Sequence, residues 1–389
     1  MRNATLTRKT KETDIAMTLT DIFDEMNDAV KIAVDVPLGI DATLGKFRVY
    51  ANYKATATVV LGFMKPGLVS YPAKEYVGKL IFDNLGLQEE DFVGAFDFHD
   101  YYIDDKIARS FVPKRHDNSN KGSFGKLLVM AGSSEFSGAA HLAIEGALRS
   151  GVGYVTALAE PELYDSLVQK FPEVIYRRPS IGTSCLDIAP FVRDIEKNDV
   201  VLLGPGCAKE GYIASLTPEI IMKYAKTVVL DATAINVLAE SSTGADAAIR
   251  ESKARVVLTP HPLEMSRLAN VSVEHIQDNR LEFAKKYAKD NACVLVLKGA
   301  ATIVTDGYDT YVNSSGSSAL AKAGSGDVLA GHISGLIASG VDPLRAAALA
   351  VYLHGHAADN LADEFTELGV TPSDLPKEMA RCLAALINE

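Results

Sequence analysis

Several features that would point directly to a class of function are scarce or missing in this chain of 389 residues. Lysine and arginine total 39 against 50 acidic residues, and the net charge of −11 argues against nucleic acid or an anionic membrane as a partner. The four cysteines lie far apart and form no C-x-x-C pair. A reduced, cytosolic setting without structural zinc is the simplest explanation of that spacing.

Long apolar segments are missing as well. No apolar run reaches the length of a membrane span without a charge or a turn residue, and the polar start Met1-Arg-Asn contains no apolar signal segment. We therefore expect a cytoplasmic protein with no membrane partner. The remaining composition, 48% hydrophobic and 23% charged, is typical of a globular protein with two domains, one of them large.

A polar stretch, 113–122, separates two parts of the chain with different patterns. Its lysine, arginine, asparagine, serine and glycine residues suit an exposed connection. We predict one domain over residues 1–113 and a second over residues 114–389.

Short apolar runs alternate with helical patterns throughout the second domain. Such runs, separated by helices like the one predicted over 138–149, are typical of a parallel sheet covered on both faces. The runs are 126–131, 154–158, 199–203, 227–231, 255–259 and 292–297. Open α/β sheets bind ligands at the carboxyl ends of their strands, so the residues that follow these runs are expected to converge on one crevice. They are Gly132, Gly204, Asp231, His261 and Lys298.

The first domain has a weaker pattern. A helical segment over 14–30 precedes two strand-like runs, 31–36 and 55–61, and a turn at Lys65-Pro-Gly67. Two or three strands are too few for an independent α/β core. This domain is therefore predicted to be a partial α/β (Rossmann-like) domain.

The tetrad Gly324-Ser325-Gly326-Asp327 precedes an apolar run, 328–338, that is predicted to be helical. N–H groups at a helix start lack intrahelical acceptors, and glycine lets a phosphate approach them closely. A carboxylate beside such a phosphate cradle makes sense as a base that takes a proton from an attacking hydroxyl. The alternative is a glycine-rich turn in which Asp327 is only an early residue of the helix.

Two further stretches that follow predicted strands have both a functional and a structural interpretation. Lys298, followed by Gly299, suits contact with nucleotide phosphates, or is a surface lysine that ends a strand. His261 and Glu264 share a face if a helix starts here, so they could contact substrate and a magnesium-bound water. The structural alternative is a capping arrangement at the helix start.

Asp231, Asn236 and the turn Gly204-Pro-Gly206 are ambiguous in the same way. The two polar side chains either face the crevice or cap the following helix, and capping is the favoured interpretation. The turn either exposes bare backbone to a ligand or is only a tight turn. Four histidines in helical, apolar surroundings are expected to be packed or partly exposed side chains rather than catalysts or metal ligands: His141, His332, His354 and His356.

Taken in order, these stretches resemble the NAD(P)H-hydrate dehydratase family, a branch of the ribokinase-like superfamily, from about residue 120 to the end. The resemblance implies a ribokinase-like α/β fold with three αβα layers around a mostly parallel sheet. Two positions depart from the family pattern, because Leu263 replaces a usual glycine and Cys207-Ala208 replaces Leu-Gly. The matching stretches are Ser137-Gly-Ala-Ala140, Leu203-Gly-Pro-Gly206, Thr259-Pro-His-Pro-Leu-Glu264, Leu297-Lys-Gly-Ala300, Ala323-Gly-Ser-Gly-Asp-Val-Leu-Ala-Gly331 and Leu353-His-Gly-His-Ala357.

The activity that this resemblance implies is repair of hydrated nicotinamide cofactors. The S-form of NADHX or NADPHX would be dehydrated to NADH or NADPH with magnesium and ADP, favoured over ATP, releasing AMP and phosphate. Family members often form tetramers, so a homo-oligomer is expected. The implied base is Asp327, beside phosphate contacts from Gly324, Ser325 and Gly326. The remaining implied contacts are nucleotide binding by Lys298, Gly299, Ala300, Ala301, Thr302 and Gly326, hydrate binding by Ala139, Gly206, His261 and Asp327, and magnesium held through water by Glu264.

The first domain resembles the second half of an NAD(P)H-hydrate epimerase domain, on the residues 33–41 and 65–67. Asp35 falls where that family carries its catalytic aspartate. Leu38 replaces a serine that helps to bind potassium, and an Asn/Gly-rich loop of the family has no counterpart. We therefore expect an inactive remnant, or a truncated domain, without epimerase activity.

Two other functions compete with the dehydratase interpretation. A ribokinase-like kinase for a hydroxymethylpyrimidine or hydroxyethylthiazole would share the cradle and the base but release a stable phosphorylated product. The stretches 259–261 and 297–299 favour the dehydratase. A nucleotide-binding protein without catalysis is the third possibility, but the charge of Asp327 argues against it because it would weaken phosphate binding.

Overall fold

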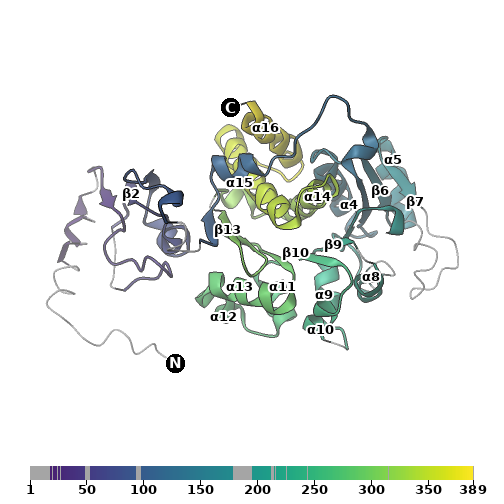
Figure 1. Cartoon of the computed structure of the whole chain (residues 1–389), viewed down its shortest axis with the longest axis horizontal. Helices are drawn as coiled ribbons and strands as arrows, with labels where there is room; N and C mark the ends of the chain where they lie inside the picture. Colours follow the sequence, from purple (N-terminus) through teal and green to yellow (C-terminus); the bar gives the residue numbers. More distant parts are fainter. Residues whose placement is uncertain are drawn as a thin grey trace. The chain divides into compact units, whose positions relative to one another are not determined.

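The computed structural model of the chain describes residues 18–388, except 20, 24, 27, 49–52, 93–97, 178–194, 212–213, 215, 225, 243 and 314. The chain divides into two compact units, Met1–Tyr102 and Ile103–Glu389 (Figure 1). This junction precedes the boundary expected at residue 113, because helix α3 (Asp105–Ser110) belongs to the second unit. The Tyr352 hydroxyl of α15 (Pro343–Gly369) donates a hydrogen bond of 2.6 Å to the Asp105 carboxylate.

The larger of the two sheets has ten strands, in the order β4-β13-β12-β11-β10-β9-β8-β5-β6-β7, and its strands β5 to β13 form the middle layer of the larger unit. Its neighbours from β11 to β7 are parallel, whereas β12 is antiparallel to both β11 and β13. The mostly parallel sheet predicted from the apolar runs is confirmed. The strands are β4 (Asp100–Tyr102), β5 (Lys126–Met130), β6 (Tyr154–Leu158), β7 (Ile175–Arg177), β8 (Val200–Leu203), β9 (Thr227–Leu230), β10 (Arg255–Leu258), β11 (Val294–Leu297), β12 (Thr302–Thr305) and β13 (Thr310–Asn313).

Helices cover both faces of this sheet. One layer contains α4, α14, α15 and α16, and the other contains α8 to α13. In the part of the chain that the structure describes, no helix has both the length and the apolar character needed to cross a bilayer. Besides α3 and α15, the helices are α4 (Ser137–Leu148), α5 (Tyr164–Lys170), α8 (Thr217–Lys223), α9 (Thr233–Ala239), α10 (Ala245–Arg250), α11 (Pro262–Ala269), α12 (Val273–Asp278), α13 (Arg280–Asn291), α14 (Ser325–Ala338) and α16 (Leu375–Asn388), with 3-10 turns η3 (Lys121–Phe124), η4 (Pro161–Leu163) and η5 (Ser318–Leu320).

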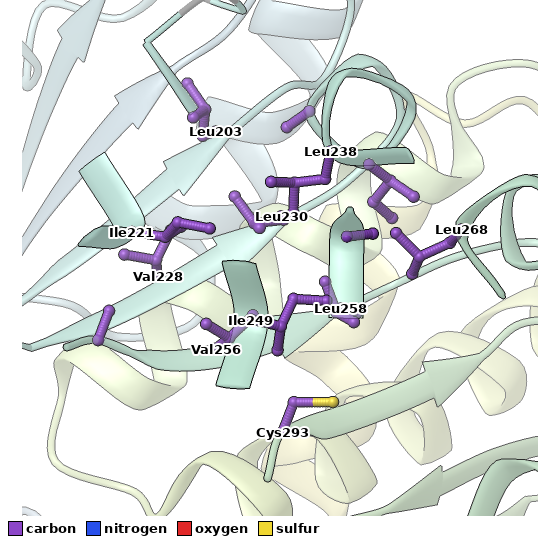
Figure 2. Close-up of a cluster of buried hydrophobic side chains, with 14 of the residues drawn as sticks. Leu203, Ile221, Val228, Leu230, Leu238, Ile249, Val256, Leu258, Leu268 and Cys293 are labelled. Atoms are coloured by element: carbon purple, nitrogen blue, oxygen red, sulfur yellow. The ribbon is translucent and has the colours of Figure 1, made fainter. Parts of the chain in front are cut away.

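Apolar side chains between the sheet and the layer of α8 to α13 form a large buried cluster (Figure 2). Val228 and Leu230 alternate along β9, so their side chains lie on the same face of the sheet. They share this cluster with Ile221 of α8 and Leu238 of α9. Full burial of each such side chain contributes about 1.5–3 kcal/mol. This core holds the strand ends from which the candidate site is built.

The first unit contains a three-stranded parallel sheet in the order β1-β2-β3. The predicted strands 31–36 and 55–61 correspond to β1 and β2, and β3 is an addition. Of the helix predicted over 14–30, residues 14–17 lie outside the described residues, and residues 18–19, 21–23 and 25 are helical. The elements are β1 (Ile32–Val34), β2 (Ala57–Leu61), β3 (Lys79–Asp83), α2 (Pro66–Val69), η1 (Ala73–Glu75) and η2 (Glu89–Phe92).

The two faces of this small sheet differ in exposure. Val60 of β2 is fully buried in a cluster with Leu68 of α2. Val34, Val59 and Ile81 are paired in register on the opposite face. Val34 and Ile81 there are 65% and 45% exposed. This face is therefore apolar and open to solvent, whereas parallel sheets are usually covered on both faces.

Candidate active site

Helix α14 begins within the tetrad Gly324-Ser325-Gly326-Asp327, as expected, and its first helical residue is Ser325. Gly324 precedes it with φ = 105°, a left-handed conformation that favours glycine. No side chain caps this helix start. The Ser325 N–H donates to the Lys322 carbonyl at 3.3 Å, which leaves the N–H groups of Gly326 and Asp327 for an anion, and the helix dipole adds partial positive charge.

The loop after β11 brings Lys298 to this helix start. A Cβ atom at Gly326 would lie 3.2 Å from the Lys298 ammonium. The two predicted phosphate-contacting segments, 298–302 and 324–327, thus meet although they lie on different elements. Because Gly326 has no side chain, the Lys298 ammonium can lie this close to the start of α14.

The Lys298 ammonium pairs with the Asp231 carboxylate at 2.8 Å. Both side chains are largely inaccessible, with exposures of 19% and 2%. The Thr259 hydroxyl donates to the same Asp231 oxygen at 2.6 Å. Burial alone would lower the pKa of Lys298, but the carboxylates of Asp231 and Glu264 raise it, and the net direction is upward. Lys298 is therefore a charged, buried group rather than a surface lysine at a strand end.

The interpretation of Asp231 and Asn236 as helix caps is wrong. Helix α9 starts after Ala232 without a side-chain cap, and the Asp231 carboxylate is paired with Lys298. The Asn236 amide donates to the Ala232 carbonyl at 3.2 Å, and its oxygen accepts from Arg267 at 3.0 Å. The pairing of β9, β10 and β11 explains the difference, because it places the ends of these strands side by side.

Asp327 lies in the first turn of α14 with a strongly perturbed acidity. Burial raises the pKa of its carboxyl to about 7, the negative charge of Asp231 adds to the rise, and Lys298 opposes it. Glu264 contributes in the same direction as Asp231. A carboxyl with a pKa near neutrality is matched to general-base catalysis, since it is both available as a base and strong enough to take a proton.

His261 and Glu264 form a capping box at the start of α11, which is the structural alternative considered from the sequence. The His261 ring accepts hydrogen bonds from the N–H groups of Leu263 and Glu264 at 3.1 and 3.2 Å. A Glu264 oxygen accepts from the His261 N–H at 2.8 Å. Burial lowers the pKa of His261 and raises that of Glu264. The neutral ring remains about half exposed and so can still contact a ligand.

The fit of magnesium to this site depends mainly on a bound nucleotide. Among the described residues, no group of three or more acidic, histidine or cysteine side chains is arranged to hold a metal ion. The Glu264 side chain is 7% exposed and already accepts the His261 N–H. An ion here would take most of its ligands from phosphate oxygens and water, with Glu264 reached through water.

Gly206 and Ala139, both predicted to contact the hydrate, lie against each other. Gly206 has φ = 60°, and a Cβ atom there would lie 2.4 Å from the Ala139 Cβ and 2.8 Å from the Phe136 carbonyl oxygen. The next residue, Cys207, is buried, and its pKa is raised to about 12 mainly by burial, with contributions from the charges of Glu160 and Asp327. The Gly206 turn thus lies against the start of α4, and α4 packs on α14, the helix that carries Asp327.

The sequence patterns predicted neither the role of Arg280 nor the ion pair between Lys298 and Asp231. The Arg280 guanidinium donates to the carbonyls of Leu297 and Lys298 at 3.1 and 3.3 Å, and burial lowers its pKa to about 10. It also lies 2.6 Å from a Cβ atom built on Gly299. Arg280 therefore fixes the backbone of the predicted nucleotide loop. No spacing or motif marks it, because its position depends on how α13 packs.

The same loop contains a strained residue. Ala301 has φ = 61°, which is unusual for a residue with a side chain, and the Thr302 hydroxyl donates to the Gly299 carbonyl at 3.0 Å. Such strain is commonly found at ligand-binding loops.

Two of the four histidines expected to be packed or partly exposed are buried, one on α14 and the other on α15. His332 and His354 are 0% and 7% exposed, and burial lowers the pKa of each to about 4. Both rings are therefore neutral at ordinary pH and act as packed side chains.

A comparison with family models identifies the family of the chain that carries these residues. Residues 127–381 match the family model described as NAD(P)H-hydrate dehydratase. The chain belongs to the NAD(P)H-hydrate dehydratase family. The match spans strands β6 to β13, nearly all of β5, helix α14 and every predicted site residue of the second unit.

Relatives of this dehydratase-family chain include larger repair enzymes. A Bifunctional NAD(P)H-hydrate repair enzyme Nnr from Moorella thermoacetica is 34% identical over 88% of this chain and 65% of its own length. The enzyme of that name from Escherichia coli is 31% identical over 93% of this chain and 67% of its own. The chain thus spans about two thirds of the length of these relatives.

Solved structures agree on the fold. An ADP/ATP-dependent NAD(P)H-hydrate dehydratase from Bacillus subtilis, co-crystallised with ATP and magnesium, matches with a TM-score of 0.62 and 29% identity, covering 73% of this chain and 97% of that one. A ribokinase-like superfamily protein from Enterococcus faecalis matches with a TM-score of 0.65 and 23% identity, covering 75% of this chain and 98% of that one. The predicted ribokinase-like fold is confirmed.

The candidate epimerase residue of the first unit is Asp35. Its backbone has φ = 67°, and its carboxylate accepts hydrogen bonds from the Lys65 ammonium and from the Leu61 N–H, the latter at 3.1 Å. The hydrogen bond from Lys65 lowers the pKa of Asp35. A carboxylate held ionised by a lysine is a weak base, and the nearby Leu38 offers no oxygen ligand from its side chain to a cation.

Proposed function

We propose that this chain catalyses the nucleotide-dependent dehydration of the S-form of NADHX and NADPHX to NADH and NADPH. The observation that carries the proposal is Asp327, a half-buried carboxyl with a pKa of about 7 at an uncapped helix start, beside the largely inaccessible Lys298. That combination joins a proton acceptor to a phosphate cradle. Membership of the NAD(P)H-hydrate dehydratase family supports the choice of substrate.

Asp327 would remove the proton from the C6 hydroxyl of the hydrate, and the hydroxyl oxygen would attack the terminal phosphoryl group of the nucleotide. The bond from that phosphorus to the bridging oxygen breaks, which releases AMP when the nucleotide is ADP. N–H groups at the start of α14 would stabilise the charge on the transferring group. The ring nitrogen then expels phosphate from C6, which leaves an iminium ion, and loss of a proton from C5 restores the dihydronicotinamide.

The surrounding residues have distinct roles in this proposal. Lys298 is too firmly paired with Asp231 to move with a nucleotide, so it would act as a fixed positive charge at the cradle. The 298–302 loop would bind the nucleotide, and Ala139, Gly206 and His261 would border the hydrate. Magnesium, carried by the nucleotide phosphates, would neutralise their charge.

The choice of ADP over ATP and the assembly of the chain as a homo-oligomer such as a tetramer are further parts of the proposal. The Bacillus subtilis relative is described as ADP/ATP-dependent, so both nucleotides belong in the assay. Comparison of the two at equal concentration tests the preference.

The test is an assay on NADH hydrate with magnesium and either nucleotide, following the return of dihydronicotinamide absorbance. The S-epimer should disappear while AMP and phosphate accumulate in equal amounts with ADP. Accumulation of a stable phosphorylated substrate would identify a kinase instead. No recovery with either nucleotide, on protein shown to be folded, would remove the proposal.

A further inference from the structure

A second concave surface lies at the opposite end of the large unit from the predicted active site. It has a volume of about 740 Å³. Residues just before β5 and just after the ends of α4 and α14 line it, whereas the active site is at the starts of those two helices. Helix α14 has 14 residues and rises about 1.5 Å per residue, so its ends lie about 20 Å apart. The two sites are therefore separate.

The lining of this cavity has a charge opposite to that of the whole chain. Four permanently charged cations, Arg109, Lys114, Arg115 and Arg149, line it together with His116, and none of the described residues in the lining is an aspartate or glutamate. The chain as a whole carries a net charge of −11. Such a concentration of one sign in a concave surface attracts anions, because the field of the cations adds up there.

Only part of this positive charge is offset locally. Among the described residues, no ion pair joins Lys114, His116 or Arg149 to a carboxylate. Arg115 donates to the Gly151 carbonyl at 2.5 Å and lies over the Phe124 ring at 3.8 Å, so its position is set without a counter-charge. The C-termini of α3, α4, α14 and α16 lie near the lining and add about half a negative charge each, which together offsets about half of the four positive charges.

The cavity also has an apolar wall. Val112, Leu383, Leu386 and Ile387 line it beside the cations. A volume of about 740 Å³ is within the range of small-molecule sites. Inorganic phosphate would fill little of it and would leave the apolar wall unused. A ligand with a phosphate chain and a flat, weakly polar ring system matches both surfaces and the size.

We propose that this cavity is a second, non-catalytic site that binds a nucleoside polyphosphate such as ATP or ADP. The phosphates lie among Lys114, Arg149 and the neighbouring arginines, and the base lies on the apolar wall of α16. Its position at the far end of α14 makes it a place where nucleotide binding is independent of the chemistry at Asp327.

The test is the number of ATP molecules bound per chain, measured by titration calorimetry with magnesium on the intact protein. Wild-type protein should bind two, and the double variant Lys114→Glu/Arg149→Glu should lose one or bind it at least about tenfold more weakly. The matched control Lys253→Glu/Lys377→Glu changes the net charge equally at exposed lysines outside the lining and should still bind two. Melting temperatures check that each variant is folded, and Arg149→Ala replaces the double variant if it is not.

Tripolyphosphate and adenosine, titrated separately, test the class of ligand. Both should bind the second site more weakly than ATP. One ATP per wild-type chain, unchanged binding in the lining variant, or tripolyphosphate binding as tightly as ATP would each overturn the proposal. Because the readout is binding, its failure is distinguishable from failure of the dehydration assay.

Discussion

The Lys298 ammonium lies 2.8 Å from the Asp231 carboxylate, and it borders the backbone of Gly326 on its other side. One lysine thereby pairs with an aspartate at the end of β9 and places its positive charge beside the start of α14. Three carboxylates, those of Asp231, Glu264 and Asp327, influence this single cation. One cation cannot neutralise three carboxylates, and the pKa is raised at both Glu264 and Asp327, in the latter to about 7.

Replacement of the predicted base should separate chemistry from binding. Asp327→Asn keeps the size of the side chain but cannot accept the hydroxyl proton, so kcat should fall by about 10²–10⁴-fold. Nucleotide affinity should be equal or higher, since a negative charge near the phosphates is removed. Single-turnover rates and equilibrium binding measure the two effects. Activity within about tenfold of wild type would show that another group is the base.

The pH dependence of the reaction should report the same carboxyl. A base with a pKa of about 7 is protonated below that value, so kcat/KM should fall about tenfold per pH unit on the acid side and level off above neutrality. Asp231→Asn removes a charge that raises this pKa, so the acid limb should move to lower pH. Asp117→Asn, an exposed change away from the crevice, is the control. If the acid side of the kcat/KM profile does not move in Asp231→Asn, the charge of Asp231 does not raise the pKa of the catalytic base.

Asp327 should also make the fold less stable at higher pH. Its folded pKa of about 7 exceeds the unfolded value of 3.8, so the protonated form stabilises the fold fully below the lower value. That contribution is lost as the pH rises through the higher one. Asp327→Asn should therefore be more stable than wild type at pH about 8, by up to about 4 kcal/mol, and similar at pH about 4. Denaturant unfolding at the two pH values measures the difference.

The close contact of Gly206 with Ala139 predicts a local packing defect. Gly206→Ala would place a methyl group 2.4 Å from the Ala139 Cβ, which should cost about 1–3 kcal/mol in stability and distort the hydrate site. Gly244→Ala is a matched control because Gly244 also has a positive φ, 79°, but a Cβ there meets nothing within 4 Å. Equal losses in the two variants would mean that backbone strain, rather than the clash, is responsible.

The first unit should have no epimerase activity. Lys65 holds Asp35 as an ion pair, which lowers its pKa, and Leu38 cannot supply an oxygen from its side chain to potassium. The purified chain should leave the ratio of R- and S-hydrates unchanged relative to buffer alone, measured by chromatography with potassium present. Faster interconversion with the protein than without it would show that this unit is an active epimerase.

The strand positions and the start of α14 were predictable because they depend on local patterns. Valine- and leucine-rich runs such as 227–231 identify buried strands, and glycines before an apolar run identify a helix start. Asp231 and Lys298 were expected at the same edge of the sheet, but their ion pair was not predictable, because 67 residues separate them and the order of β9, β10 and β11 brings them together. The role of Arg280 depends on the packing of α13, and the acidity of Asp327 depends on burial. Neither is encoded in a local motif.

The apolar, solvent-facing side of the three-stranded sheet has a practical consequence for handling the protein. Val34, Val59 and Ile81 are paired in register there, so they form a continuous row of apolar side chains across the three strands rather than scattered exposed ones. Protein preparations that contain the first unit alone should aggregate at concentrations where the second unit stays monodisperse, because contiguous apolar surface promotes self-association. Truncation within this chain therefore changes its colloidal behaviour as well as its domain content.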